Sequence, residues 1–385
     1  MHQTTTMSQK LSHQLTDPNT KKLSILTLSG TALTVETGSE GKLKTTEKTF
    51  NDKEAASKEF IKKEWELLKK GYVLHNDNAG PGEPALHYYI GGGYTGALSF
   101  AATADNIYIY KNNGDYSANS APDSLVVLSA KGDRIGDVNL PEKLAWDIAY
   151  NPVNSSLLMD LDYSIYEYGI EGDTFKQLAE RGNSITSFIT VADYTQAYAA
   201  DDTAFVTDNN NDVLMSYPYQ PEMVRGSVRF CAQLSADGQL LALHQRDGEI
   251  IIFNTAEGMI KGTITADFVG VAQMEFSKDS RLLIVREEYG RWGMRYFDTD
   301  TFTEIAFNEL EVPEYTKEVN GFCLNANQSK LVLIQRSWVY VYDFVGKKLL
   351  HKFKADHVVK TLKAKFAGEL LGIRSDYGCF SLYAV

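Results

Sequence analysis

Two short stretches of this sequence match binding motifs in part, and each lacks an element that its chemistry needs. Residues 91–96 read Gly-Gly-Gly-Tyr-Thr-Gly, the Gly-x-Gly-x-x-Gly spacing of dinucleotide sites. Such sites place phosphate at the N-terminus of a helix that follows a strand. Strand-like sequence flanks this motif on both sides. The glycines therefore indicate a flexible turn.

Residues 208–212, Asp-Asn-Asn-Asn-Asp, suggest a calcium loop, but Val213 replaces its glycine and Tyr219 its bidentate acid. The Asp298-Thr299-Asp300 run has equivalents in neighbouring repeats, which favours a plain β-turn over a phosphoryl-transfer site. No two histidines have metal-ligand spacing; they are His2, His13, His75, His87, His244, His351 and His357. We predict no catalytic residue, no metal and no cofactor, while a site assembled from distant segments stays open.

Arginine recurs just after the second strand-like run of four consecutive repeats, with aromatic residues nearby. These residues are Arg246, Arg286, Tyr289, Arg291, Trp292, Arg336, Trp338, Arg374 and Tyr377. The corresponding turns of earlier repeats carry Asp160, Asp162, Asp208 and Asp212. Arg, Trp and Tyr dominate interaction hot spots, and Arg pairs well with carboxylates. We predict a partner-binding face with an Arg/aromatic half and an acidic half; alternatively, each arginine only bonds a neighbouring repeat.

A repeat of short apolar strands must position these turns. In residues 227–264 the runs are cut by Ala-Asp-Gly and Arg-Asp-Gly, which are hairpin signals. Apolar residues that end the first strand of each repeat recur every 41 to 50 residues, at Phe100, Tyr150, Val191, Leu234, Phe276, Leu324 and Phe366. Four strands at that period predict a seven-bladed β-propeller over residues 85–385.

The sequence also predicts how the ring closes. It ends after the third strand of the last repeat, and residues 85–90 form a strand-like run before the first repeat. Pairing that run with the last strand would remove an exposed edge.

The repeats resemble those of WD-repeat propellers. Residues 235–238 and 277–280 match the first turn of such repeats. The Trp-Asp ending has become Phe253-Asn254, Phe297-Asp298 and Tyr342-Asp343, and the Gly-His opening is absent.

Residues 21–76 predict a small α+β domain, preceded by a flexible tail (residues 1–20) and followed by a turn-rich linker (residues 76–84). Strands are expected at 22–28, 32–36 and 42–50, and a helix over 52–70, capped by Asn51 and ended by Gly71. Residues 50–72, with Ala56, Phe60 and the closing Lys-Lys-Gly-Tyr, resemble the WGR domain of poly(ADP-ribose) polymerases and of bacterial regulator-type proteins.

The WGR resemblance implies contact with DNA or with neighbouring domains. Thr37-Gly38-Ser39 stands where the naming Trp-Gly-Arg motif would be, so both side chains that distinguish the motif are lost. This loss favours a structural or docking role over DNA binding.

Composition narrows the function classes. The 385 residues carry a net charge of −12; residues 1–80 hold 12 lysines against 10 acids, and the rest 26 basic against 40 acidic residues. This balance argues against nucleic-acid binding by the larger part. No apolar run reaches a membrane span. Three cysteines within apolar strands suit reduced thiols in the cytosol.

The overall prediction is a mostly β protein, a WGR-like α+β domain plus a seven-bladed propeller, that docks a protein or peptide partner without catalysis. The alternatives are an enzyme or small-ligand binder at the propeller channel, and a DNA-associated accessory protein. The oligomeric state stays open, and a monomer is compatible with the sequence.

Overall fold

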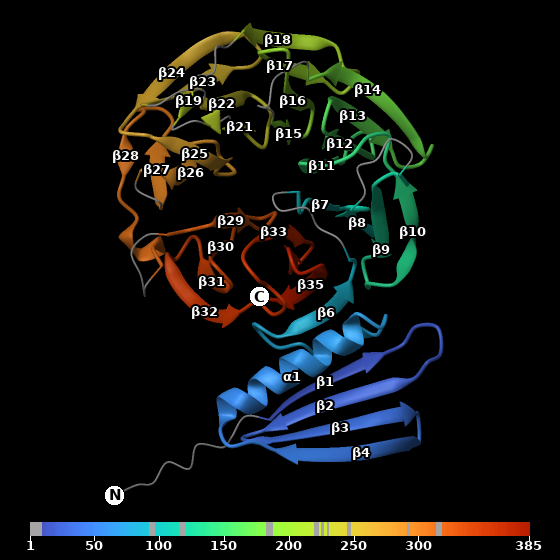
Figure 1. Cartoon of the computed structure of the whole chain (residues 1–385). Helices are drawn as coiled ribbons and strands as arrows, with labels where there is room; N and C mark the ends of the chain where they lie inside the picture. The colour runs from blue at the N-terminus through green and yellow to red at the C-terminus, as the bar shows by residue number, and fades with distance from the viewer. Residues whose placement is uncertain are drawn as a thin grey trace, which may run out of the picture.

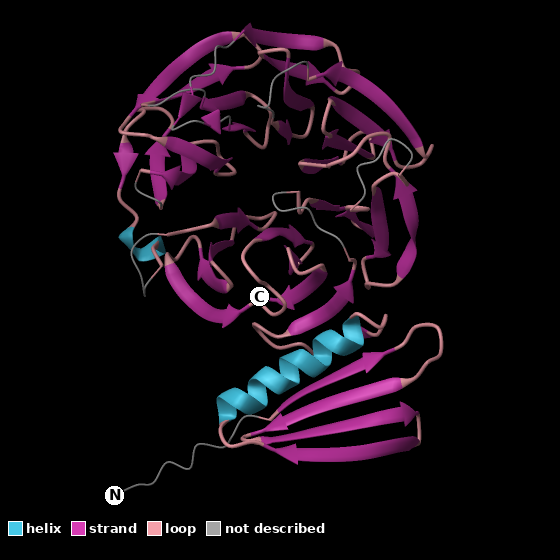
Figure 2. Cartoon of the chain, viewed as in Figure 1, coloured by secondary structure: helices cyan, strands magenta, loops and turns pink. Residues whose placement is uncertain are grey.

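The computed structural model shows a ring of β-sheets with a small sheet-and-helix unit attached at one side (Figure 1). It describes residues 10–91, 97–114, 120–181, 188–218, 223–224, 227–228, 231–244, 248–290, 293–312 and 318–385. Strands make up most of this part, and helix is confined to α1 and a short 3-10 turn, η1 (Figure 2). No helix among the described residues combines the length and apolarity that a bilayer span requires.

Six sheets of four antiparallel strands stand around the ring as separate blades. The first three are β7 (Phe100–Ala102), β8 (Asn106–Lys111), β9 (Ser124–Ser129) and β10 (Arg134–Asn139); β11 (Asp147–Asn151), β12 (Ser156–Asp160), β13 (Ser164–Gly169) and β14 (Thr174–Glu180); and β15 (Ile189–Val191), β16 (Thr195–Ala200), β17 (Thr203–Asp208) and β18 (Val213–Pro218).

The other three follow a short hairpin, β19 (Met223–Val224) and β20 (Ser227–Val228). They are β21 (Cys231–Leu234), β22 (Leu240–His244), β23 (Glu249–Asn254) and β24 (Met259–Thr265); β25 (Gly270–Phe276), β26 (Leu282–Tyr289), β27 (Met294–Asp298) and β28 (Glu304–Ile305), then η1 (Asn308–Leu310); and β29 (Gly321–Leu324), β30 (Lys330–Gln335), β31 (Trp338–Asp343) and β32 (Lys348–Lys354).

The count of separate blades is six, so the prediction of seven needs correction. The remaining propeller strands are β33 (Leu362–Ala367), β34 (Leu370–Ser375), β35 (Cys379–Ala384) and β6 (Pro84–Tyr89). They belong to a nine-stranded sheet ordered β33-β34-β35-β6-β5-β1-β2-β3-β4. The repeat period in the sequence predicted these strands. It did not indicate that their sheet continues into the N-terminal unit, because pairing between distant strands leaves no periodic signal.

The predicted ring closure is confirmed. Strand β6 pairs antiparallel with β35, with Ser381 opposite His87 and Leu382 opposite Leu86. Backbone bonds extend the pairing at both ends, from Gly82 N to Ala384 O (2.8 Å) and from Ile90 N to Gly378 O (2.9 Å). Strand β33 in turn lies against β29 and β7, so the ring is continuous.

The middle strands are apolar on both faces because each lies between two neighbouring blades. In β30, Leu331 and Leu333 pack with Ile284 of β26, whereas Val332 and Ile334 pack with Ile373 of β34. A strand covered on both sides reads as a continuous apolar run rather than as an alternating one. This is why the second and third strands gave the clearest signal in the sequence.

The turns that resemble WD repeats have a common hydrogen-bond pattern. Ser235 donates from Oγ to Asp237 (2.6 Å), and Ser277 does the same to Asp279 (2.7 Å). Thr255 Oγ1, two residues after Phe253, donates to Gly238 O (2.6 Å). Gly238 has φ +70°, and a Cβ there would lie 2.1 Å from Thr195 Oγ1 of the neighbouring blade. The position therefore requires glycine for both its backbone and its space.

The N-terminal unit contains β1 (Leu11–Thr16), β2 (Leu23–Ser29), β3 (Ala32–Ser39), β4 (Lys42–Thr49), α1 (Lys53–Leu68) and β5 (Val73–His75). Strand β1 lies in the stretch predicted as a tail, where its alternation is too short to stand out. The predicted linker, residues 76–84, instead spans the turn between the paired strands β5 and β6.

Helix α1 packs against β2 and β3 through one face, and it also contacts β5 and β6. Its buried residues are Ala56, Phe60, Glu64, Trp65 and Leu68. Ile61, next to Phe60 in the sequence, is 39% exposed and does not belong to this face. Glu64 does, and a charged side chain on a buried face is unusual.

We expect the helix cap to show directly in stability. The carboxylate of Asp52 accepts a hydrogen bond from Ala55 N at 2.7 Å, so the cap is Asp52 and not the predicted Asn51. Asp52→Ala should lower the free energy of unfolding by about 1 kcal/mol, whereas Asn51→Ala should change it by less than about 0.5 kcal/mol. Urea unfolding followed by circular dichroism measures both; a larger loss for Asn51→Ala would contradict the assignment.

Candidate functional site

The turn between β30 and β31 presents two of the predicted partner-binding residues to solvent. Arg336 has φ +56°, and its backbone N–H donates to Asn320 Oδ1 at 2.5 Å. Its guanidinium side chain is 80% exposed and lies 3.8 Å from the Glu318 carboxylate. Trp338 is 39% exposed, with Lys352 Nζ 5.4 Å from its ring centre.

Arg374, predicted for the same face, is fully buried. Its guanidinium donates to Ser375 O (3.0 Å) and to Gly91 O (2.8 Å). Burial lowers its pKa to about 10, which leaves it charged at neutral pH. Arg374 therefore holds the closing segment of the ring and offers no surface to a partner.

The other predicted residues have different surroundings. Tyr377 is 43% exposed and stacks on Trp65 of α1, with ring centres 4.2 Å apart. Arg286 borders the central channel and donates to Val319 O at 3.5 Å. Tyr289 ends β26, and its side chain is outside the described part of the chain. Three more predicted residues also lie outside the described ranges: Arg246, Arg291 and Trp292.

The predicted acidic half is only partly correct. Asp160 lies at a turn between a second and a third strand, but it is buried and pairs with Arg181 at 3.5 Å. Asp208 and Asp212 flank the turn between β17 and β18, the third and fourth strands of their blade, and so belong to the opposite face. The sequence alignment of the repeats is wrong at this blade. Its first strand, β15, has only three residues, which made the second strand hard to locate.

The exposed residues near β31 form one continuous surface with the connection to β33. Ala355 N donates to Ser337 O at 2.8 Å. The Asp376 carboxylate accepts bonds from the backbone N–H groups of residues 359, 360 and 361 at 2.8–3.0 Å. These bonds hold three neighbouring segments together. We call the result the basic–aromatic surface; it comprises Arg336, Trp338, Lys354, Val359, Lys360 and Tyr377.

The central channel holds a cavity of about 800 Å³ lined by the first strands of the blades. Asp147 accepts bonds from Lys363 (2.7 Å), Lys365 (3.0 Å) and Ser99 (2.8 Å). Burial opposes ionisation, but the two lysines hold the pKa of Asp147 well below its usual range. Burial also raises the pKa of Glu275 in the same cavity to about 7. The channel thus contains one carboxylate that stays ionised, Asp147, and a second, Glu275, that can exchange a proton near neutral pH.

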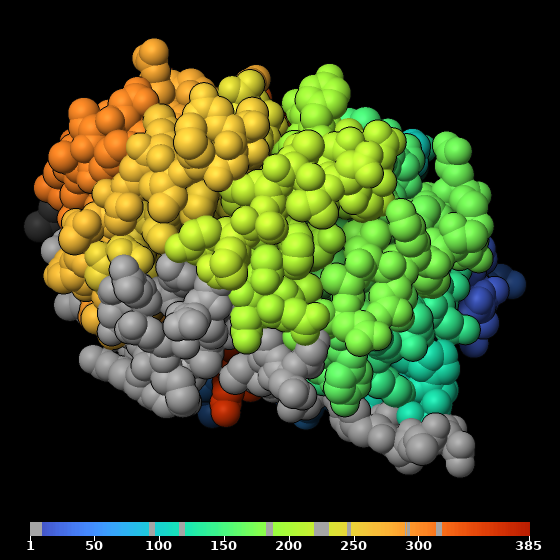
Figure 3. Space-filling model, turned by 90° about the horizontal axis from the view of Figure 1, so that it is seen from above, coloured from blue at the N-terminus to red at the C-terminus, as the bar shows by residue number. Residues whose placement is uncertain are grey.

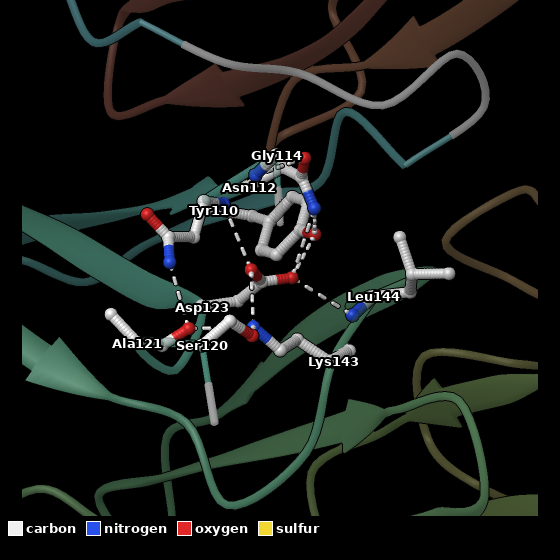
Figure 4. A network of polar contacts seen from close by, with 9 residues as sticks. Tyr110, Asn112, Gly114, Ser120, Ala121, Asp123, Lys143 and Leu144 are labelled. Carbon is white, nitrogen blue, oxygen red and sulfur yellow. Dashed lines mark hydrogen bonds and ion pairs between the residues drawn. The ribbon is translucent and has the colours of Figure 1, made fainter. Parts of the chain in front are cut away.

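A third polar cluster joins the first two separate blades (Figure 4). The buried carboxylate of Asp123 accepts bonds from Tyr110 OH (2.6 Å), Asn112 Nδ2 (3.1 Å) and Leu144 N (3.1 Å). Lys143 Nζ lies 3.8 Å away. Residues of both blades donate hydrogen bonds to the carboxylate oxygens of Asp123. Asp123 therefore stabilises the contact between the blades rather than providing a binding site.

No two histidines have metal-ligand spacing in the sequence, but three of them lie close together in space. His13, His87 and His357 meet around Glu64 at the junction of the small unit and the ring. Although burial opposes it, hydrogen bonds from His13 and His357 lower the pKa of Glu64 far below its ordinary value. The residues are up to 344 positions apart. The only available signal was an acidic residue on the apolar face of α1.

Comparisons with known proteins bear on the fold. No family model matches the chain, and no curated protein matches it. A solved structure titled "Crystal Structure of Mitotic Checkpoint Complex" matches with a TM-score of 0.61 and 12% identity, over 80% of this chain and 94% of that chain. The ring is a β-propeller. At this identity the likeness shows the fold alone, and 1515 chains of solved structures match the chain.

The raised pKa of Glu275 predicts a pH dependence. Folded protein keeps a proton that the unfolded chain releases between pH 4.5 and about 7, so the free energy of unfolding falls as pH rises through this range. Glu275→Gln should make this fall less steep in urea unfolding at a series of pH values. Glu257→Gln, at an exposed position of the β23–β24 turn, is the control. Parallel curves for wild type and Glu275→Gln would contradict the prediction.

Proposed function

We propose that this chain is a non-catalytic interaction protein whose propeller docks a partner protein through the basic–aromatic surface. The partner segment that this surface fits is acidic and carries an apolar side chain. The propeller holds its turns in fixed positions around a closed ring, which suits docking, and the function is argued from the surface itself rather than from the fold.

The exposed pair Arg336 and Trp338 is the observation that carries the proposal. Arg336 points from a turn whose backbone is fixed by Asn320. Its ion pair with Glu318 joins side chains that are 80% and 46% exposed, and such pairs contribute little free energy. A partner carboxylate can therefore replace Glu318, while Trp338 supplies apolar contact area beside it.

Charge gives the surface its selectivity. The chain has a net charge of −12, yet two exposed lysines lie beside Trp338: Lys352 Nζ is 5.4 Å from its ring centre, and Lys354 is its partner in the β31–β32 pairing. An acidic partner is repelled by most of the protein and attracted here, which favours one docking orientation.

Several finer assignments belong to the same proposal. We propose that β33, β34, β35 and β6 act as a seventh blade, which is supported by the contacts of β33 with β29 and β7. We propose that the N-terminal unit is a WGR-like module used for docking onto the ring rather than for DNA. Lys58 and Lys63 of its helix are paired with Glu54 and Glu66, which supports that choice. A cytosolic location is supported by three buried free thiols.

The alternative is a small-ligand site in the channel. It is favoured by one observation, the proton-exchanging Glu275 beside the Asp147–lysine group in a cavity of about 800 Å³. Burial raises the pKa of Cys323, also in the cavity, so this thiol stays protonated and is a poor nucleophile.

Docking can be tested with a fluorescent acidic peptide that contains leucine and phenylalanine. We expect the double variant Arg336→Ala/Trp338→Ala to weaken binding at least about tenfold in fluorescence anisotropy, because both side chains are hot-spot types. Higher salt should weaken wild-type binding as well.

The matched control lies on the rim of the ring, at the outer strands β18 and β24, in the part coloured yellow-green to yellow in Figure 3. The exposed apolar residues of these strands are Val213, Leu214, Met259 and Ile260. Val213→Ser/Ile260→Ser should bind like wild type, and both variants should keep the wild-type thermal midpoint. Equal binding by wild type and the Arg336/Trp338 variant, or loss only in the rim variant, would contradict the proposed surface.

A further inference from the structure

Four titratable side chains from four separate elements meet where the small unit joins the ring. His13 comes from β1, Glu64 from α1, His87 from β6, and His357 from the connection between β32 and β33. Glu64 Oε1 lies 2.5 Å from His13 Nδ1, and Glu64 Oε2 lies 2.8 Å from His357 Nε2. The rings of His87 and His357 are 5.2 Å apart, and every one of the four residues is at most 6% exposed.

This cluster leaves buried nitrogen atoms without hydrogen-bond partners. His87 Nε2 and His357 Nδ1 are both buried and make no hydrogen bond in the described structure. Buried polar atoms are nearly always bonded, so two unsatisfied imidazole nitrogens beside a buried carboxylate need a physical explanation. Neutral imidazole and carboxylate are both zinc ligands, and two histidines with one glutamate form a known zinc donor set; imidazole also suits copper, iron and nickel.

We propose that Glu64, His87 and His357 bind a single zinc ion. One ligand atom from each of the three lies within 4.8 Å of the others. Bonds of about 2.0–2.2 Å in a tetrahedral zinc site place ligand atoms roughly 3.3–3.6 Å apart. The most distant of these atoms must therefore approach one another by about 1 Å to surround one ion.

The surrounding residues fit the outer part of such a site. His87 Nδ1 is 2.7 Å from Ser381 Oγ. In the tautomer with the proton on Nδ1, this nitrogen donates to the hydroxyl and Nε2 keeps the lone pair that a metal requires. Asp356 Oδ2 lies 3.7 Å from His87 Nε2, outside this group of three, so its carboxylate adds negative charge next to the site. Two carboxylates would balance the charge of the ion, which suits a buried site. His13 bonds the other oxygen of Glu64 and would position it.

The consequence is structural. The ligands come from the helix of the small unit, from the ring-closing strand and from the ring itself, so the ion would fasten all three. Trp65 covers the site by stacking on His357, with ring centres 5.3 Å apart. A closed site of this kind gains its affinity together with folding. The inference stands apart from the proposed docking surface and does not depend on it.

The test uses the full chain without a histidine tag. The protein is unfolded with chelator, refolded with or without zinc, and freed of excess metal. Elemental analysis should then find one zinc ion per chain, and cobalt in place of zinc should give the intense visible absorption of a tetrahedral site. The thermal midpoint should be higher with zinc than without.

Variants separate ligands from neighbours. Glu64→Gln and His87→Gln should abolish stoichiometric metal, and His13→Gln should weaken zinc affinity by about 10–100-fold while leaving a site. His75→Gln, on β5 outside the cluster, should bind like wild type. Because ligand variants can fail to fold, the wild-type measurement decides. Wild-type chain that refolds without retaining zinc or cobalt, and whose thermal midpoint zinc does not raise, would overturn the proposal and leave a metal-free hydrogen-bonded cluster.

Discussion

Strand β6 pairs along both of its edges, with β35 on one side and β5 on the other. The first pairing closes the propeller with a segment that lies almost 300 residues away from its partner. The second makes the small unit an extension of the same sheet. Closure satisfies backbone groups that would otherwise form an exposed edge. It also fixes the position of α1, because the helix packs on strands of this sheet. Arg374, which bonds Gly91 O just beyond β6, strengthens the same junction from within the ring.

The positions of the buried histidine cluster and of the basic–aromatic surface both depend on this closure. His87 on β6 meets Glu64 on α1 and His357 on the ring because these three elements converge where β6 passes from one unit to the other. Tyr377 follows β34 and stacks on Trp65, so the basic–aromatic surface ends at the small unit. The basic–aromatic surface and the buried cluster therefore share a structural boundary, although they consist of different side chains.

Local pattern predicted much of the fold. Apolar runs and turn signals located the second and third strands of the last four repeats and the closing strand at residues 85–90, and capping signals located the helix. The predictions that were wrong or missing concern residues whose environment depends on segments distant in the sequence. Arg374 belongs to the same sequence series as Arg336, yet one is fully buried and the other 80% exposed. Asp208 was assigned to the wrong turn because the short β15 obscured the register. The histidine cluster could not be predicted, since its members adjoin only after the ring has closed. The continuous nine-stranded sheet was missed for the same reason.

Hydrogen exchange measured by mass spectrometry tests the central claim, that β6 and β35 form one closing unit. Peptides covering residues 84–90 and 379–385 should exchange as slowly as the central strands β30 and β31, and both should lose protection at the same denaturant concentration. Rapid exchange of residues 84–90 in an otherwise protected ring, or loss of their protection well before that of β35, would contradict the account.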